Sequence, residues 1–286
     1  MRPRKGRLFV RPAELKPVLR YPGSKWNIAR WIVKHFPPHS TYLEPFFGSG
    51  AVFFVKPPSH TETINDINGD VVNLFRVIRE RPKGMAALIE KTPWARAEYY
   101  ESYERTGEAL EDARRFLVRC WMARGTKLCH RTGWRNDIQG RQGTSCAKIW
   151  NSLPVRILAV AERLKQAQIE NQPAMQLIER YKHPCVLIYA DPPYLLATRR
   201  EKAQYAHEMT DEQHAELLDA LDQHPGPVLI SGYDCQLYQD RLSHWKRKTT
   251  RALAEGGRRR TETLWINPVA AATLTVEQVT IFNKEG

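Results

Sequence analysis

The chain has 286 residues, which is enough for one large α/β domain, with or without an inserted module. It carries 44 Lys and Arg against 31 Asp and Glu, and the resulting net charge of +13 favours a polyanionic partner. Its five cysteines are odd in number and include no Cys-x-x-Cys pair, which excludes a disulfide framework and indicates a reduced, cytosolic protein.

The first segments of the chain are basic and then rich in turn-forming residues. Residues 1–16 form a basic arm, which either grips phosphates or is a tail without a role. Gly23 lies in a Pro-Gly turn, and Ser24 is placed to cap a helix predicted over residues 26–35. Lys25 at the start of that helix opposes the helix dipole, so it needs an anion or a carboxylate nearby.

A glycine turn follows the first predicted strand, residues 41–44. Gly48 and Gly50 permit positive φ and the close approach of a ligand to the backbone. The turn lacks the Gly-Lys-Ser/Thr of a phosphate loop, and Phe53 stands where a dinucleotide fingerprint has its third glycine. A ligand that is not mainly phosphate is therefore expected here.

A second predicted strand, within residues 61–68, ends at an acid. Asp66 is placed to accept the two hydroxyls of a ribose, or to cap the helix predicted over residues 71–80. Both roles are compatible if Asn68 or Asp70 caps the helix instead.

The amino-acid composition changes in the middle of the chain. Residues 98–122 are predicted to be mainly helical, whereas residues 123–150 are rich in Gly, Arg, Thr and Gln with aromatic residues interleaved. Residues 114–148 hold nine basic residues and one acid, which favours DNA contact over a solvated insertion. The candidate DNA contacts are Arg124, Lys127, His130, Arg131, Trp134, Arg135, Arg141 and Lys148.

Two classes of site or location are excluded by spacing and length. Cys129, His130 and Cys146 do not have the spacing of a zinc module, so no metal is expected. No apolar run is long enough to span a membrane, and no apolar core follows the basic N-terminus as it would in a signal peptide.

The later part of the chain alternates helices with strands. A helix over residues 152–166 is predicted to bury Val155, Leu158, Ala161 and Leu164 on one face, and residues 169–170 suit a short edge strand. The remaining predictions are a capping box of Thr210 and Gln213 that starts a helix over 211–223, and strands at 228–233, at 261–267 and around 279–282.

The stretch Asp191–Tyr194 (Asp-Pro-Pro-Tyr) is the most informative one. It follows an apolar run, residues 185–189, that suits a strand buried on both faces, and its two prolines end that strand abruptly. An acid, rigid carbonyls and an aromatic ring then lie at the carboxyl end of a central strand, where open α/β sheets bind ligands. The alternative is a strand-to-loop turn with one exposed acid. The polar residues 195–207 suit a loop over such a site.

In this order, the motifs resemble those of the Dam-type (class alpha) DNA adenine-N6 methyltransferases, over about residues 19–267. The matching stretches are Tyr-Pro-Gly-Ser-Lys at 21–25, Glu-Pro-Phe-Phe-Gly-Ser-Gly at 44–50, Asn-Asp-Ile-Asn at 65–68 and Asp-Pro-Pro-Tyr at 191–194. The resemblance implies a Rossmann-like doubly wound α/β methyltransferase sheet with an inserted, mainly helical plus hairpin target-recognition domain. It also implies S-adenosylmethionine as cofactor, S-adenosylhomocysteine as product, and double-stranded DNA as substrate.

The resemblance assigns domains and site residues to this sequence. The implied domains are the arm, 1–16, a catalytic domain, 17–80 with 151–286, and a recognition domain, 81–150. The implied catalytic residues are Asp191, Pro192, Pro193 and Tyr194. The implied cofactor-binding residues are Tyr21, Gly23, Ser24, Lys25, Glu44, Pro45, Phe46, Gly48, Ser49, Gly50, Asp66, Ile67 and Asp191.

Several alternatives stay open at the level of the sequence. The acceptor could instead be cytosine N4, RNA or a protein amide, and a non-enzymatic DNA-binding protein or a nicotinamide-dependent dehydrogenase fits less well. The recognition segment lacks the stretch expected of a GATC reader, so the target sequence is open. Also open are the presence of a cognate restriction endonuclease, a monomeric or homodimeric state, and a DNA contact by residues 251–260.

Overall fold

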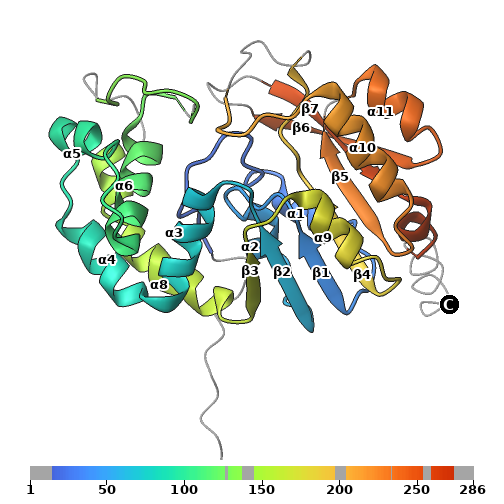
Figure 1. Ribbon diagram of the computed structural model, residues 1–286, viewed down its shortest axis with the longest axis horizontal. Helices are drawn as coiled ribbons and strands as arrows, with labels where there is room; N and C mark the ends of the chain where they lie inside the picture. Colours follow the sequence, from blue (N-terminus) through green and yellow to red (C-terminus); the bar gives the residue numbers. More distant parts are fainter. Residues whose placement is uncertain are drawn as a thin grey trace, which may run out of the picture.

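The computed structural model describes residues 15–125, 128–136, 145–196, 204–232, 234–253 and 259–273 (Figure 1). The predictions that lie outside these ranges concern most of the basic arm, Lys127, Arg141, the end of the strand at 228–233 and the segment around 279–282.

Seven strands form one sheet in the order β3-β2-β1-β4-β5-β7-β6 (Figure 1). They are β1 Thr41–Glu44, β2 Thr61–Asn65, β3 Ala167–Glu170, β4 Val186–Ala190, β5 Val228–Gly232, β6 Lys246–Leu253 and β7 Arg259–Ile266. The first five are parallel, whereas β7 runs antiparallel to both β5 and β6. The strand order reverses between β1 and β4, so the crevice at their carboxyl ends is the expected ligand site. The predicted doubly wound sheet is confirmed.

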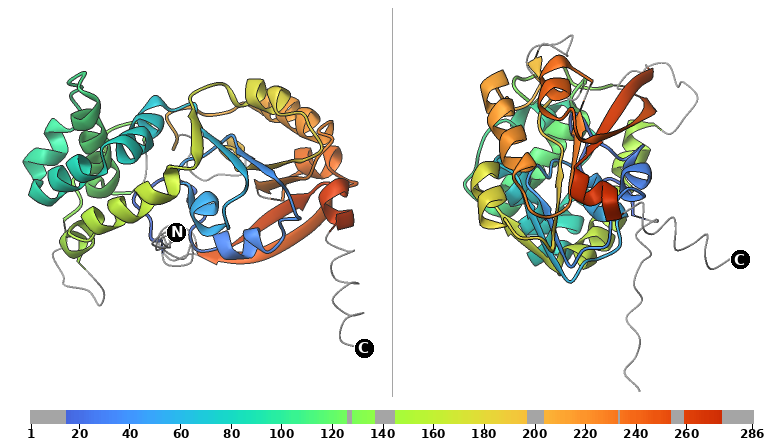
Figure 2. Two further views of the ribbon diagram at one scale, coloured as in Figure 1. Left: turned by 90° about the horizontal axis from the view of Figure 1, so that it is seen from below. Right: turned by 90° about the vertical axis from the view of Figure 1, so that its right-hand side faces the viewer.

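Helices cover both faces of the sheet (Figure 2). One face carries α9 Ala174–Arg180, α10 Asp211–Asp222 and α11 Gln236–Arg241, and the other carries α1 Ala29–Val33 and α2 Ala51–Val55. Tyr42 and Leu43 on β1 are both fully buried but belong to separate hydrophobic cores, because successive side chains of a strand point to opposite faces.

The remaining helices form a lobe beside the β3 edge of the sheet, at the left of Figure 1. They are α3 Gly69–Glu80, α4 Pro82–Lys91, α5 Arg96–Glu101, α6 Ala109–Met122, α7 Cys146–Trp150 and α8 Leu153–Leu164. Phe116, Trp121 and Trp150 of this lobe are buried in the same core as Phe53 and Tyr42 of the sheet domain. The lobe is therefore fixed to the sheet by continuous apolar packing.

The predicted buried face of α8 is confirmed at Ala161 and Leu164 and wrong at Val155 and Leu158. Val155 is 72% exposed and Leu158 43% exposed, whereas Leu153 and Ile157 are fully buried in their place. A series at i, i+3, i+6 and i+9 rotates steadily around a helix of 3.6 residues per turn, so its two ends lie on opposite sides. The true buried stripe starts two residues earlier.

One of the three capping predictions is wrong, and strand β6 was not predicted. Ser24 does not cap α1, and its hydroxyl instead lies 2.8 Å from that of Ser49. Residues 98–122 are mainly helical as predicted, in two helices, α5 and α6, and strand β6, which pairs with β7, was missed because its sequence is mostly basic and polar. Asn68 caps α3, and Thr210 forms the predicted capping box at α10.

Within the described ranges, no helix is both long enough and apolar enough to cross a bilayer.

Candidate active site

An ion pair stands at the carboxyl end of the central strand. Asp191 follows β4, which is buried on both faces, and its Oδ1 lies 2.9 Å from the Nζ of Lys25. The same ammonium donates a hydrogen bond to the carbonyl oxygen of Gly23 at 2.8 Å. The carboxylate that Lys25 was expected to need is therefore the first residue of the catalytic motif.

The pair is ionised at neutral pH. Burial raises the pKa of Asp191 from 3.8 to about 6, and the adjacent Lys25 ammonium limits that rise. Burial by itself lowers the pKa of Lys25, but Asp191 and Glu262 more than compensate and raise it above its ordinary value. Asp191 is consequently a hydrogen-bond acceptor, with its side chain 18% exposed toward the crevice.

The glycine turn and the acid after β2 are joined by backbone hydrogen bonds. The N–H of Gly48, at a φ of +49°, donates to Oδ2 of Asp66 at 2.8 Å, and the N–H of Asn68 donates to Oδ1 at 2.9 Å. Burial raises the pKa of Asp66 to about 6, against the effect of these two N–H groups. Each carboxylate oxygen accepts one backbone bond and keeps a second acceptor position for a ligand hydroxyl.

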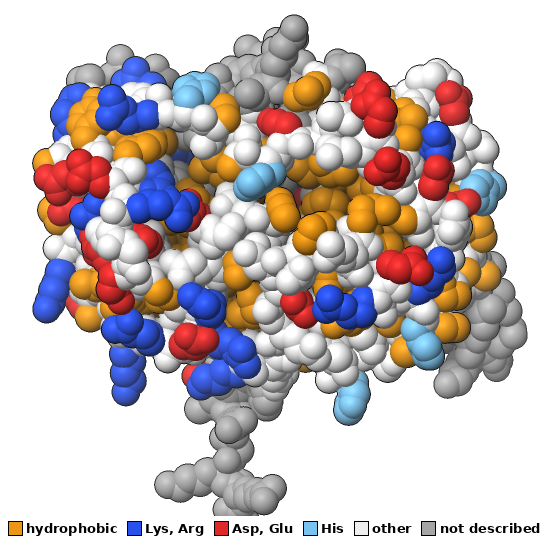
Figure 3. All heavy atoms as spheres, viewed as in Figure 1, with side chains coloured by type: hydrophobic (Ala, Val, Ile, Leu, Met, Phe, Trp, Pro, Cys, Tyr) orange, Lys and Arg blue, Asp and Glu red, His pale blue; other side chains and the backbone are white. Residues whose placement is uncertain are grey.

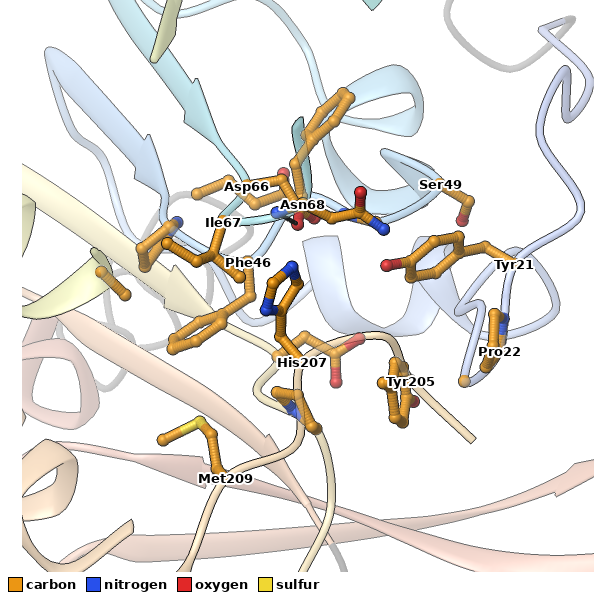
Figure 4. A pocket seen from close by; sticks show the side chains of 18 of the residues that line it. Tyr21, Pro22, Phe46, Ser49, Asp66, Ile67, Asn68, Tyr205, His207 and Met209 are labelled. Atoms are coloured by element: carbon orange, nitrogen blue, oxygen red, sulfur yellow. Dashed lines mark hydrogen bonds between the residues drawn. The ribbon is translucent and has the colours of Figure 1, made fainter. Parts of the chain in front are cut away.

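These motifs line one cavity of about 400 Å³, a size typical of small-molecule sites (Figure 4). The predicted residues on its wall are Tyr21, Gly23, Ser24, Lys25, Glu44, Pro45, Phe46, Gly48, Ser49, Asp66, Ile67, Asp191 and Pro193. Three predicted residues are not on the wall: Gly50, Pro192 and Tyr194. Gly50 has a left-handed φ of +67° and starts α2, where a Cβ would lie within 2.4 Å of the Phe47 ring.

Residues 204–209, which we call the strap, border the cavity; a loop over the site was predicted across residues 195–207, but the contacts that the strap makes were missed. Tyr205 and His207 reach from it toward Tyr21 and Asn68 across the cavity (Figure 4). Oε1 of Glu208 fixes the turn by accepting the backbone N–H groups of residues 204 and 205 at 2.8 and 2.9 Å. The signal available from the sequence was the polar stretch after the catalytic motif, which predicts a loop over the site without naming its contacts.

Two apolar side chains lie at the rim of the cavity, one of them predicted and one not. Ile67, which was predicted, is 44% exposed, and Met175 at the start of α9, which was not predicted, is 39% exposed. On the face seen in Figure 3, hydrophobic side chains gather over the region of α9 and α10, whereas Lys and Arg gather over the helical lobe. An apolar rim of this kind suits a flat heterocycle.

The cavity favours a cationic ligand. Glu44 is 2% exposed and accepts a hydrogen bond from the Tyr42 hydroxyl at 2.6 Å. Burial raises the pKa of Glu44 to about 8, although the bond from Tyr42 opposes the rise, so this carboxyl is mostly neutral at pH 7. The other carboxyl groups at the wall are those of Asp66, Asp191, Glu208 and Glu216, and they outnumber the one ammonium group, that of Lys25, so the wall is net negative.

The described residues among the predicted DNA contacts lie on the helical lobe, and two of them take part in contacts between a guanidinium and an aromatic ring. The guanidinium of Arg131 lies 5.3 Å from the ring centroid of Tyr100, and that of Arg96 lies 5.0 Å from the ring of Trp134. Arg124 donates to the side chain of Asn136 at 3.1 Å.

The rest of this segment is held mainly through its backbone. Ala123 and Trp134 form an isolated antiparallel bridge, and the backbone N–H of Arg135 donates to Met122 at 2.7 Å. His130 lies beside Cys129, and Lys148 is exposed on α7. The structure thus places Arg124, His130, Arg131, Trp134 and Arg135 on one irregular segment and Lys148 on a helix, and none of them lines the cavity.

In the part of the chain that the structure describes, no cluster of three or more His, Cys, Asp or Glu side chains is arranged to hold a metal ion.

Comparisons with known proteins give the family. Residues 21–255 match the model of the D12 class N6 adenine-specific DNA methyltransferases. The chain is 25% identical over 236 residues to the DNA adenine methylase of Escherichia coli (strain K12), covering 78% of this chain and 82% of that protein. It is 24% identical over 242 residues to the DNA adenine methylase of Serratia marcescens, covering 79% and 86%. Among solved structures, the rRNA methyltransferase aviRa from Streptomyces viridochromogenes matches with a TM-score of 0.38 and 14% identity, over 92% of this chain and 94% of that one, a likeness too loose to support a conclusion.

Proposed function

The chain belongs to the D12 class N6 adenine-specific DNA methyltransferases, and from this premise we propose how its residues divide the work. The enzyme moves the methyl group of S-adenosylmethionine to the N6 amino group of adenine in DNA, at specific sites. Membership of this family excludes the alternatives left open by the sequence: a cytosine, RNA or protein acceptor, a non-enzymatic role and a nicotinamide-dependent reaction. The observation that carries the proposed residue roles is the Lys25–Asp191 pair, which opens onto the cavity at the end of β4.

The cavity wall fits S-adenosylmethionine in shape and charge. Asp66 offers acceptor positions to the ribose hydroxyls, and Ile67 and Met175 offer apolar surface to the purine. A Cβ on Gly48 would lie 3.1 Å from the Tyr21 ring, so glycine keeps the turn open beside the ligand. The net negative charge of the wall suits the cofactor's net positive charge. When bound, the cofactor supplies a methyl group on a sulfonium sulfur, which is already a good leaving group.

The acceptor nitrogen needs help from the protein. The adenine amino group is a poor nucleophile because its lone pair is delocalised into the ring. In our proposal, the Asp191 carboxylate and the Pro192 carbonyl accept hydrogen bonds from the two N–H groups of this nitrogen. The nitrogen therefore moves toward tetrahedral geometry, and its lone pair points at the methyl carbon. Positioning and this preorganised polar contact supply much of the remaining acceleration. Lys25 holds the Asp191 carboxylate in place and keeps it ionised.

The target base leaves the helical stack to reach this site. N6 of a stacked, paired adenine is out of reach of a cavity of this kind, so we propose that the base flips out. Tyr194 then provides a stacking face, worth about 1–3 kcal/mol by analogy with other base–aromatic contacts. The basic and aromatic residues of 124–148 contact double-stranded DNA. We assign residues 81–150 to this recognition role, and residues 17–80 with 151–286 to catalysis.

The cellular setting of the reaction is also part of the proposal. The relatives reported above are bacterial DNA adenine methylases, and we propose a cytoplasmic enzyme that acts on double-stranded DNA without a metal ion.

The experiment that tests these roles separates base flipping from chemistry. Single-molecule sequencing of methylated plasmid DNA first gives the target motif, and 2-aminopurine then replaces the target adenine. We expect Asp191→Ala to bind the duplex and raise 2-aminopurine fluorescence as the wild type does, while methyl transfer is lost. Tyr194→Ala should weaken both the fluorescence response and transfer. An unchanged response in Tyr194→Ala would refute the stacking role, and retained transfer in Asp191→Ala would refute the catalytic one.

A further inference from the structure

A buried carboxylate on β7 lies behind the catalytic motif. Oε2 of Glu262 accepts a hydrogen bond from the hydroxyl of Tyr194 at 2.5 Å. Both side chains are buried, with Glu262 9% and Tyr194 7% exposed. Strand β7 is not a neighbour of β4 in the sheet, because β5 lies between them. The bond therefore ties the loop after β4 to a strand beyond its neighbour.

The ring of Tyr194 is held at a second point. Nζ of Lys25 lies 4.6 Å from the centroid of that ring, and the same ammonium forms the ion pair with Asp191. Glu262, Tyr194, Lys25 and Asp191 therefore form one continuous set of contacts, which we call the anchor chain. The charge of Glu262 also reaches Lys25, whose pKa it helps to raise.

A carboxylate buried at this position of the sheet lowers the stability of the fold unless it has a hydrogen-bond partner. Burying a charged group without partners costs far more than burying an alkyl side chain. Leu264, two residues along the same strand and therefore on the same face, is fully buried in the core. An apolar residue at 262 would fill the space but could not accept the tyrosine hydroxyl. The carboxylate is thus explained by the group it holds.

We propose that Glu262 is a positioning residue for methyl transfer: it fixes the hydroxyl of Tyr194, so the ring is set in the orientation that receives the flipped adenine. This inference rests on the proposed stacking role of Tyr194. Glu262 does not line the cavity and acts through the ring. The aromatic ring is then set before DNA arrives, and the base does not have to order it.

Four variants test the hydrogen bond itself. Glu262→Gln keeps an acceptor for the hydroxyl, Glu262→Ala removes it, Tyr194→Phe removes the donor, and the double variant Glu262→Ala/Tyr194→Phe removes both. We expect kcat to fall on the order of 10- to 100-fold in Glu262→Ala and in Tyr194→Phe, because misplacing a reacting geometry by about 1 Å costs this much. The double variant should be no worse than either single one, and Glu262→Gln should stay within about three-fold of the wild type.

The readouts distinguish positioning from a general loss of structure. The 2-aminopurine response should be weakened in Glu262→Ala and restored in Glu262→Gln, while the Kd for S-adenosylmethionine stays within a few-fold. Tyr238→Phe is the matched control, because it removes another buried tyrosine hydroxyl, 3.2 Å from His214 in the opposite core. It should leave kcat and fluorescence unchanged. If Glu262→Ala does not fold, Glu262→Gln and Tyr194→Phe still carry the comparison.

Two results would overturn the inference. One is full activity and fluorescence response in Tyr194→Phe or Glu262→Ala. The other is a Glu262→Gln variant as impaired as Glu262→Ala, which would mean that the charge matters and not the bond to the hydroxyl. Tyr194→Ala, which deletes the ring, separates this failure from that of the proposed function. If Tyr194→Ala keeps the fluorescence response, the stacking role itself is wrong. If Tyr194→Ala loses the response while Tyr194→Phe keeps it, the stacking role stands and only the positioning role of Glu262 is wrong.

Discussion

The cavity at the strand ends and the recognition segment hold their functional side chains in different ways. In the cavity, Asp66 is fixed by two backbone N–H groups, and Asp191 by a buried ammonium. In the proposed recognition segment, Arg131 lies exposed over the ring of Tyr100. With the roles proposed above, the comparison predicts that the cofactor site is set before its ligand arrives, whereas the recognition surface completes its contacts on DNA.

The two regions meet at the strap. The backbone N–H of Leu128 in the recognition segment donates to the carbonyl oxygen of Gln204 at 2.9 Å. The next residue, Tyr205, lines the cavity, and its hydroxyl occupies the space that a Cβ on Gly23 would need. A preorganised site and an adaptable one are thus adjacent, and changes in each should have effects of different sizes and kinds.

Short of removing Asp191 itself, the largest effect should come from removing its cation. Lys25→Met leaves Asp191 without its cation, so the pKa of Asp191 rises above its present value of about 6 and less carboxylate is present at pH 7. We expect the single-turnover transfer rate at pH 7 to fall by about 10²-fold and to recover partly toward pH 9. Lys165→Met, which removes a lysine that is 54% exposed, is the control. A pH profile identical to that of the wild type would contradict this account of Lys25.

The next effect should come from the ribose acid. Asp66→Asn cannot accept from both Gly48 and Asn68 with its one oxygen while also accepting from the ribose. We expect the Kd for S-adenosylmethionine to rise on the order of 10- to 100-fold, with a smaller change in kcat. Isothermal titration measures the affinity, and Glu90→Gln on the exposed surface of α4 is the control. Unchanged affinity would place the ribose elsewhere.

The wild-type enzyme should lose activity in acid. A carboxyl with a folded pKa of about 6 is ionised above that pH, and below it Asp191 becomes protonated and stops accepting from the adenine amino group. Asp66 is raised to the same range and weakens cofactor binding in the same direction. We expect kcat/KM to fall by at least about ten-fold per pH unit below 6. A rate that stays constant from pH 7 to pH 5 would be inconsistent with Asp191 acting as a carboxylate.

A smaller effect is expected in the recognition segment. Arg131→Ala should weaken DNA binding by about 1–3 kcal/mol if the side chain reads a base, or lower the salt slope of binding by about one if it contacts a phosphate. The Kd for S-adenosylmethionine should not change. Arg241→Ala on α11, which removes an arginine paired with Asp219, is the matched control. If Arg131→Ala behaves as Arg241→Ala does, the DNA contact is not at this residue.

The smallest effect tests the packing of the lobe. Val155 is 72% exposed, so Val155→Lys should change the free energy of unfolding by less than about 0.5 kcal/mol. Ile157→Ala, on the buried side of α8, should cost about 2–5 kcal/mol. Urea denaturation followed by circular dichroism compares the two. Equal costs would mean that the exposed face of α8 is covered in solution.

The sequence was most informative where a single residue determines the local backbone conformation. The apolar run before Asp191, the glycine at 48 and the acid at 66 predicted the strand ends and the cavity wall, and the glycine at 50 predicted the left-handed turn that starts α2. These features are local, because a proline ends a strand and a glycine takes a left-handed φ within a few residues of sequence.

What the sequence could not predict depends on contacts between distant segments. The bond between Tyr194 and Glu262 spans 68 positions, and the strap reaches the cavity only through the fold of the whole sheet domain. The basic strand β6 has no apolar alternation, because its pairing with β7 and not burial of its side chains defines it. On α8, a series drawn at intervals of three residues rotates around the helix, so it begins on the exposed face at Val155 and reaches the buried face only at Ala161.

The most direct test of the central claim measures methyl transfer and identifies the acceptor atom. Wild-type enzyme and Asp191→Ala are incubated with tritium-labelled S-adenosylmethionine and plasmid DNA, and the product is mapped by single-molecule sequencing. The account predicts label on N6 of adenine at one sequence motif with the wild type, and a rate at least about 10³-fold lower with Asp191→Ala, although that variant still binds DNA. Label on cytosine, or a rate within a few-fold of the wild type in Asp191→Ala, would contradict it.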